Sequence, residues 1–182
     1  VQEVLENINP LLVLEEKLVE LMLKYGDYVL DRKTPENETY QITVIEEIIN
    51  HLEEDQCEII SPINQKIIEE IKLGIAQSEL RSGNFFMTLM DENIVLKTAD
   101  ALVNPYETSN WEKHNIYFSK EEELVDRIVK DVVIRYKREY IIKIINDLKQ
   151  QISEENSEES YKKIINLTQL KNKIDEKLYR IL

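Results

Sequence analysis

Apolar residues follow the spacing of amphipathic helices through most of the first 118 residues of the chain. Leu14, Leu18 and Leu21 recur every three or four positions behind Asn9-Pro10, a cap followed by proline at the first helical position. Three later apolar runs also begin at capping signals. These signals are Thr43 with Glu46, Ser61 with Pro62, and Asp91. The pattern therefore predicts five or six short helices that pack as an all-α body.

Two details of this body depend on turn signals. The helix that begins at Pro62 is predicted to continue until Ser82-Gly83-Asn84. Residues 27–41 are the least helical segment, and the short β-prone runs 28–30 and 40–42 lie on either side of a loop signal. The pattern therefore allows one small β-hairpin near residues 28–43.

The last third of the chain, residues 119–182, is predicted to form a long helical hairpin. Ser119 and Glu122 match a capping box, and neither glycine nor proline occurs from there through Ile152. A polar turn follows, and a second helix is expected from Ser157 to about Arg180. We therefore expect a helical body over residues 1–118 and a hairpin subdomain over residues 119–182.

This hairpin has more apolar positions than one seam between two helices needs. Residues 141, 145, 148 and 152 have the 4-3-4 spacing of a coiled-coil seam. The opposite rim is also apolar and consists of Val133, Tyr140, Ile142 and Ile144. Part of this surface must contact the body, a second copy of the chain or a partner. A symmetric homodimer through the rim is therefore one hypothesis.

Charge is unevenly distributed along the chain. Residues 1–118 hold 9 Lys and Arg against 23 Asp and Glu, whereas residues 119–182 hold 14 Lys and Arg against 13 Asp and Glu. The net charge of the whole chain is −13. An acidic body repels phosphate, so we do not expect direct nucleic-acid binding. The basic terminal helix suits an acidic or mixed protein surface better. A solvated helix with its own i,i+4 ion pairs would explain the same lysines.

Composition indicates a folded helical protein of the cytoplasm. Apolar residues make up 42% of the chain, and only three glycines and four prolines occur. Cys57 is the single cysteine, which excludes an internal disulfide and favours a reducing compartment. Apolar runs all fall short of the ~20 residues of a membrane span. The chain begins at Val1 without methionine, so we expect a fragment of a longer protein.

The sequence contains no residue set with catalytic or metal-binding spacing. His51 and His114 lie far apart, and neither has a second histidine or a nucleophile at a suitable distance along the chain. Asp55 and Glu58 would raise the pKa of the Cys57 thiol, so we do not expect a nucleophile there. The prediction is that this chain has no enzyme activity, no cofactor and no metal site.

Three segments follow the order of elements in a known family. They are residues 18–26 (LVELMLKYG), 48–55 (IINHLEED) and 99–111 (ADALVNPYETSNW). The first resembles the opening helix of the C-terminal, helicase-interacting domain of bacterial replicative DNA primase. The second is similar to that domain's second helix and the loop after it, and the third resembles a link in primases of the Bacteroides group. The terminal hairpin then follows, as in the family.

The resemblance implies a non-catalytic part of a primer-synthesising enzyme. Primases of this family hold zinc in one domain and a divalent metal such as magnesium in a polymerase core, and neither domain is recognisable here. In the family, the terminal hairpin docks the enzyme onto the N-terminal domains of the hexameric replicative helicase during DNA replication. Interface hot spots favour aromatic residues and arginine. The predicted partner-binding residues are Tyr161, Lys171, Leu178, Tyr179 and Arg180.

Two alternatives stay open at this point. One is a structural module that self-associates through the apolar rim. The other is the N-terminal domain of a replicative helicase, whose helical fold is understood to be related to the primase body.

Overall fold

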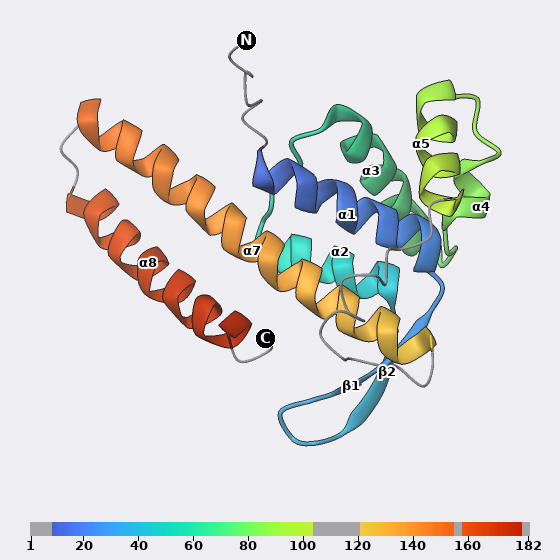
Figure 1. The fold of residues 1–182 in the computed structure, drawn as a ribbon, viewed down its shortest axis with the longest axis horizontal. Coiled ribbons are helices and arrows are strands. Elements are labelled where there is room, and N and C mark those ends of the chain that lie inside the picture. Colours follow the sequence, from blue (N-terminus) through green and yellow to red (C-terminus); the bar gives the residue numbers. More distant parts are fainter. Residues whose placement is uncertain (1–8, 104–120, 155–157, 180–182) are drawn as a thin grey trace, which may run out of the picture.

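The computed structural model describes residues 9–103, 121–154 and 158–179, which contain seven helices and one two-stranded sheet. In chain order the elements are α1 (Pro10–Tyr25), β1 (Val29–Lys33), β2 (Thr39–Thr43), α2 (Val44–Glu54), α3 (Pro62–Ala76), α4 (Gly83–Phe86), α5 (Glu92–Val103), α7 (Glu121–Glu154) and α8 (Glu158–Tyr179). The predicted fold class is confirmed: a helical body with one small β-hairpin is followed by two long C-terminal helices (Figure 1).

Helix α1 lies at the centre of the body and contacts α2, α3, α4, α5 and α7 (Figure 1). Its N-terminus forms as predicted: Asn9 accepts a hydrogen bond from the Leu11 amide at 3.1 Å, and Pro10 occupies the first turn. Because neighbours surround it, α1 buries more than one stripe of side chains. Its almost fully buried residues include Leu18, Val19, Leu21, Met22 and Leu23.

The predicted β-hairpin is confirmed and leads directly into α2. Strands β1 and β2 pair antiparallel, from Val29 opposite Thr43 to Lys33 opposite Thr39. Arg32 of β1 ties this hairpin to two helices, since its guanidinium lies 2.7 Å from the Glu47 carboxylate of α2 and 2.5 Å from the Asp126 carboxylate of α7. These ion pairs are mostly shielded from water, which strengthens them relative to exposed pairs.

Capping at α2 and α5 also follows the sequence. Thr43 and Glu46 form the expected capping box, with the Glu46 amide donating to the Thr43 hydroxyl and the Thr43 amide donating to the Glu46 carboxylate. Asp91 accepts from the Asn93 amide at 3.2 Å at the start of α5. Both caps are local, so the residues within one turn are enough to specify them.

The cap of α3 differs from the prediction. Ser61 makes no side-chain capping hydrogen bond. Instead Glu15 of α1, which is fully buried, accepts hydrogen bonds from the amides of Ile60 at 2.6 Å and Ser61 at 2.9 Å, and from the side chain of Asn64 at 2.8 Å. A carboxylate at a helix N-terminus is favoured by the helix dipole. This contact fixes α3 against α1.

Helix α3 ends at Ala76, earlier than the predicted stop at Ser82. The chain reverses at Ser78, which has a φ of 57°, and a Cβ on Gly74 would lie 2.7 Å from the Glu79 carbonyl oxygen. The reversal brings Arg81 back over α3, where its guanidinium lies 2.6 Å from the Glu70 carboxylate. The Ser82-Gly83 signal therefore marks the beginning of α4 and not the end of α3.

The first half of α7 belongs to the core of the body. Val125, Ile128, Val129, Val132 and Tyr136 are buried in the same apolar cluster as α1 and α2. The core of the body therefore extends along α7 as far as Tyr140, beyond the predicted subdomain boundary at residue 119. We call described residues 9–103 and 121–140 the body, and residues 141–154 together with α8 the arm.

Three contacts fix α7 where the arm leaves the body. The Tyr140 hydroxyl donates to the Gln56 carbonyl at 3.2 Å and accepts from the Glu58 amide at 3.0 Å. Lys137 lies 2.7 Å from the Asp55 carboxylate in the same loop. Because α7 continues without a break from the body into the arm, these contacts hold the arm at a defined angle.

Some predicted features lie outside the described residues. They are the irregular link at 106–118 with Trp111, the cap at Ser119, and the part of the polar turn at 155–157.

Candidate docking surface

The arm extends from the body as a pair of helices. Helix α8 folds back along the C-terminal half of α7 and reaches at least Arg138, on the side of the molecule away from α3 and α5 (Figure 1). Among the described elements, α7 is the only one with which α8 has an extensive contact. The 22 residues of α8 therefore depend on a single neighbour.

The seam between α7 and α8 buries little surface. Ile141 and Ile145 are buried although they lie outside the core cluster of the body, so α8 covers them. Leu148 and Ile152 of the predicted seam are half-buried. On α8, the positions of intermediate burial include residues 164, 167, 171, 174 and 178, and none of its described side chains is fully buried.

An ion network joins the two helices of the arm. The Asp175 carboxylate lies 2.5 Å from the Arg138 guanidinium of α7 and 2.7 Å from the Lys171 ammonium one turn earlier on α8. The hydrogen bond from Lys171, followed by that from Arg138, holds the pKa of the Asp175 carboxyl below its ordinary value. Arg138 also pairs with the adjacent Glu139. The network therefore orients α8 at the root of the arm.

The structure places the five predicted partner-binding residues differently from one another. Tyr161 is half-exposed near the tip of the arm. Lys171 belongs to the ion network, and Leu178 is partly buried at one of the seam positions. Tyr179 ends α8, but its side chain and all of Arg180 lie outside the described part of the chain. The role of these five residues in binding stays a prediction.

The apolar rim proposed for a homodimer is largely internal. Val133 and Tyr140 are buried in the core of the body, and Ile144 packs against that core. Ile142 is half-buried. The surplus apolar surface noted in the sequence thus contacts the body, which removes most of the surface on which the dimer hypothesis was based.

A second row of α8 residues faces solvent. It was not predicted as a contact surface. Lys163, Asn166, Leu170, Lys173 and Lys177 are all exposed. Their spacing of three and four residues places them on one helix face, and this spacing is visible in the sequence. What the sequence does not reveal is which face of α8 covers α7, so this row could not be separated from the seam.

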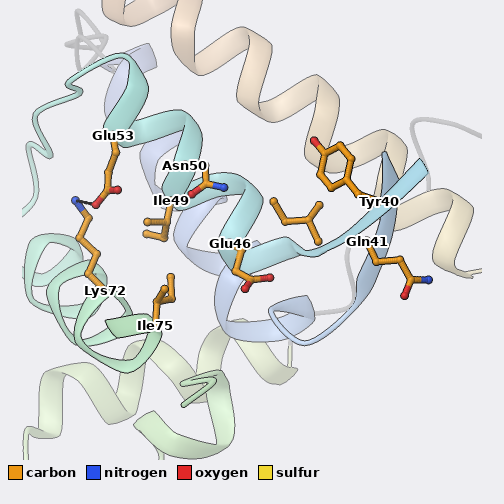
Figure 2. A pocket seen from close by; sticks show the side chains of 9 residues that line it. Tyr40, Gln41, Glu46, Ile49, Asn50, Glu53, Lys72 and Ile75 are labelled. Carbon is orange, nitrogen blue, oxygen red and sulfur yellow. Dashed lines mark ion pairs between the residues drawn. The ribbon is translucent and has the colours of Figure 1, made fainter. Parts of the chain in front are cut away.

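The body carries an open groove of about 260 Å³ between β2, α2 and α3. In Figure 2, Tyr40 and Gln41 line its β2 side, Glu46 and Asn50 come from α2, and Glu53 pairs with Lys72 of α3 across it at 3.1 Å. The floor is apolar and includes Ile49 and Ile75. Its lining contains neither histidine nor cysteine, so the groove offers a shallow contact surface and no evident nucleophile.

Of the three residues whose side chains are suited to chemistry, Cys57 and His51 are half-buried, and His114 lies outside the described residues. Burial, with a smaller contribution from Asp55, raises the pKa of the Cys57 thiol to about 12. The expected direction is confirmed, but burial is the larger cause. Burial, followed by the nearby Lys137, lowers the pKa of His51, so its imidazole is neutral at neutral pH. Both residues line a very small internal cavity beside Tyr136.

Two further observations concern the described residues only. In that part of the chain, no group of three or more His, Cys, Asp or Glu side chains is placed to share a metal ion. None of the helices within it is both long enough and apolar enough to cross a membrane.

Fold and surface together define a helical domain with a projecting two-helix arm. The chain belongs to the family described as a domain of unknown function, DUF8430, whose sequence model matches residues 3–181. Neither the curated proteins nor the solved structures contain a significant match to the chain.

Proposed function

We propose that this chain is a non-catalytic protein-docking domain that joins a DNA primase to the hexameric replicative helicase. The observation that carries the docking role is the packing of α8. Among the described elements it has an extensive contact with α7 only, and none of its described side chains is fully buried. A helix of 22 residues is roughly 33 Å long, and such a helix normally buries one apolar face more fully. A partner surface would supply the missing contact.

The way the arm is attached to the body supports the same role. Its α7 half continues a helix that is anchored in the core, and its root is fixed by Tyr140 and Lys137. A docking element held at a fixed angle loses less conformational entropy on binding than a flexible tether. The body therefore presents α8 to a partner in one orientation.

The identity of the partner rests on the resemblance to the helicase-interacting domain of primase. Two of the three similar segments lie in α1 and α2, at the centre of the body. Most of the third, residues 104–111, lies outside the described part of the chain. In this proposal the partner surface is formed by the N-terminal domains of the helicase, docking needs no metal, and the complex forms in the cytoplasm.

The test is a binding measurement between the full chain and the N-terminal domains of the cognate replicative helicase. Deleting residues 158–182 should abolish binding, while the remaining chain should still unfold cooperatively because α8 is not part of the body's core. Binding of the intact chain should persist in a metal chelator. Unchanged affinity after the deletion would contradict the proposal.

If the deletion variant does not fold, a point variant tests the same contact. Leu170 on α8 is 47% exposed and Leu96 on α5 is 58% exposed, so Leu170→Asp and Leu96→Asp are matched changes at the surface of two helices. Introducing a carboxylate at a contact position should weaken binding by about tenfold or more, whereas the same change outside the interface should have little effect. Equal losses for the two variants would contradict docking through this face of the arm.

A further inference from the structure

The exposed row on α8 is regular in both spacing and composition. Lys163, Leu170 and Lys177 are separated by seven residues, with Asn166 and Lys173 between them. We call these five residues the lysine row. Each one immediately precedes a position of intermediate burial on α8, so the row lies about 100° around the helix from the side that covers α7. The row therefore borders the seam without belonging to it.

Outside this row, three of the four described lysines of the arm are in ion pairs, and Lys149 is the exception. Lys162 pairs with Glu158, Lys171 with Asp175, and Lys143 with Asp147. Within the described residues, Lys163, Lys173 and Lys177 are in no ion pair, even though Glu159 and Glu176 lie nearby in sequence. Their charges are therefore not neutralised inside the arm.

Leu170 gives the row an apolar centre. It is 47% exposed and stands three residues before Lys173 and seven before Lys177. An apolar side chain with lysines before and after it along one helix face has the composition of an interface hot spot with a polar rim. Lone exposed leucines are common, so the argument depends on the unpaired lysines around this one.

We propose that the arm binds an acidic protein surface, in which an apolar recess takes Leu170 and carboxylates pair with Lys173 and Lys177. This inference rests on the proposed docking function and names the chemistry of the partner's surface. Charge complementarity of this kind mainly accelerates association and selects the partner. It also distinguishes the arm from the acidic body, which would repel the same acidic partner surface.

Two other occupants fit the lysine row less well. Nucleic acid would meet three lysines without an aromatic residue in the row, on a chain with a net charge of −13. The acidic body of a second copy would satisfy the lysines, but each copy would bring its own negative charge to the contact. The experiment below therefore includes a test for each of these two occupants.

The experiment compares two double charge reversals in the full chain. Lys173→Glu with Lys177→Glu changes the lysine row, and Lys17→Glu with Lys33→Glu makes the same change in net charge at exposed positions of the body, on α1 and on β1. Binding to the helicase N-terminal domains is measured at about 0.1 M and about 0.5 M salt. The first variant should lose about tenfold in affinity at low salt and less at high salt, and the control should change by less than about threefold.

Each remaining outcome has a defined consequence. If the intact chain binds the helicase and both variants weaken equally, the lysine row is not the contact and this inference is overturned while the docking function stands. If the intact chain does not bind the helicase at all, both this inference and the proposed docking function are overturned. Titrations with single-stranded DNA and sedimentation of the chain alone complete the set. Loss of DNA binding or of self-association in the first variant only, with helicase binding unchanged, assigns the row to that occupant and overturns the proposal.

Discussion

The body and the arm are built from the same kinds of residues but reach very different degrees of burial. In the body, α1 contacts five other helices and has many almost fully buried side chains. In the arm, α7 is the only described element with which α8 has an extensive contact, and none of the described side chains of α8 is fully buried. Local stability increases with the amount of buried apolar contact. The free energy of local unfolding should therefore be lower for the arm than for the body. The arm has the lower local stability, so a bound partner would stabilise the arm more than the body.

Helix α7 connects these two regions and shares the properties of both. Its first half has Tyr136 and Ile128 inside the core. Among the described side chains of residues 141–154, only Ile141 and Ile145 are buried. A continuous helix transmits an orientation without a hinge, whereas a loop at the same place would not. The comparison therefore describes a stable body that holds a marginally packed arm.

The largest expected effect separates the two halves of α7. Ile128 is 2% exposed in the core and Ile145 is 7% exposed at the seam. Ile128→Ala should lower the free energy of unfolding of the body by about 2–5 kcal/mol, because it leaves a cavity among packed side chains. Ile145→Ala should change that quantity by less than about 0.5 kcal/mol while accelerating hydrogen exchange in α8. Urea unfolding measures the stability of the body, and residue-resolved hydrogen exchange measures local opening of α8. Equal losses of body stability in the two variants would contradict the difference between body and arm.

A second variant tests how the body is held together over long range. Glu15→Ala removes the acceptor for the amides of Ile60 and Ser61 and should cost about 2–4 kcal/mol, since those donors are left without a partner. Glu20→Ala on the same helix should stay within about 0.5 kcal/mol of the parent. Thermal unfolding of both variants gives the comparison. A neutral Glu15→Ala would mean that water replaces the carboxylate at the start of α3.

The smallest effect concerns the ion network at the root of the arm. The pKa of Asp175 is lower in the folded protein than in the unfolded chain, so its contribution to stability is present above about pH 4 and is lost as the pH falls through the lowered pKa. The pair is partly exposed and its contribution should be below about 1 kcal/mol.

Carboxyl titration by nuclear magnetic resonance follows Asp175 directly. In Arg138→Gln the Asp175 pKa should move up toward its ordinary value, because one of its two cationic partners is lost. Arg135→Gln removes a different ion pair on α7, with Asp131, and should leave the titration unchanged. An unshifted midpoint in Arg138→Gln would show that Lys171 alone sets this pKa.

Local signals account for most of what the sequence predicts correctly. The caps at Asn9, Thr43 and Asp91 use partners within three residues, so a short stretch of sequence specifies each one. Ser61-Pro62 has the same appearance, yet its cap is Glu15, which is 46 residues away. A partner at that distance is brought into place only by the tertiary fold. The early end of α3 has a similar origin in the packing of Arg81.

The candidate surface could be predicted only in outline. The surplus of apolar residues in the last third indicated an additional contact, but Val133 and Tyr140 turned out to make it with the body. Periodicity gives the faces of a helix without saying which face meets which neighbour. For the same reason, Lys171 and Leu178 were predicted as contact residues, whereas the exposed lysine row was identified only when the seam was known.

Hydrogen exchange of the intact chain, with and without the helicase N-terminal domains, tests the docking role most directly. Free α8 should exchange through local opening, well before α1 and α2. On binding, amides of α8 and of residues 141–154 should slow by about tenfold or more, while those of α1, α2 and α3 keep their rates. Slowing confined to β2, α2 and α3, around the groove of Figure 2, with unchanged exchange in α8, would contradict the assignment of the arm as the docking element.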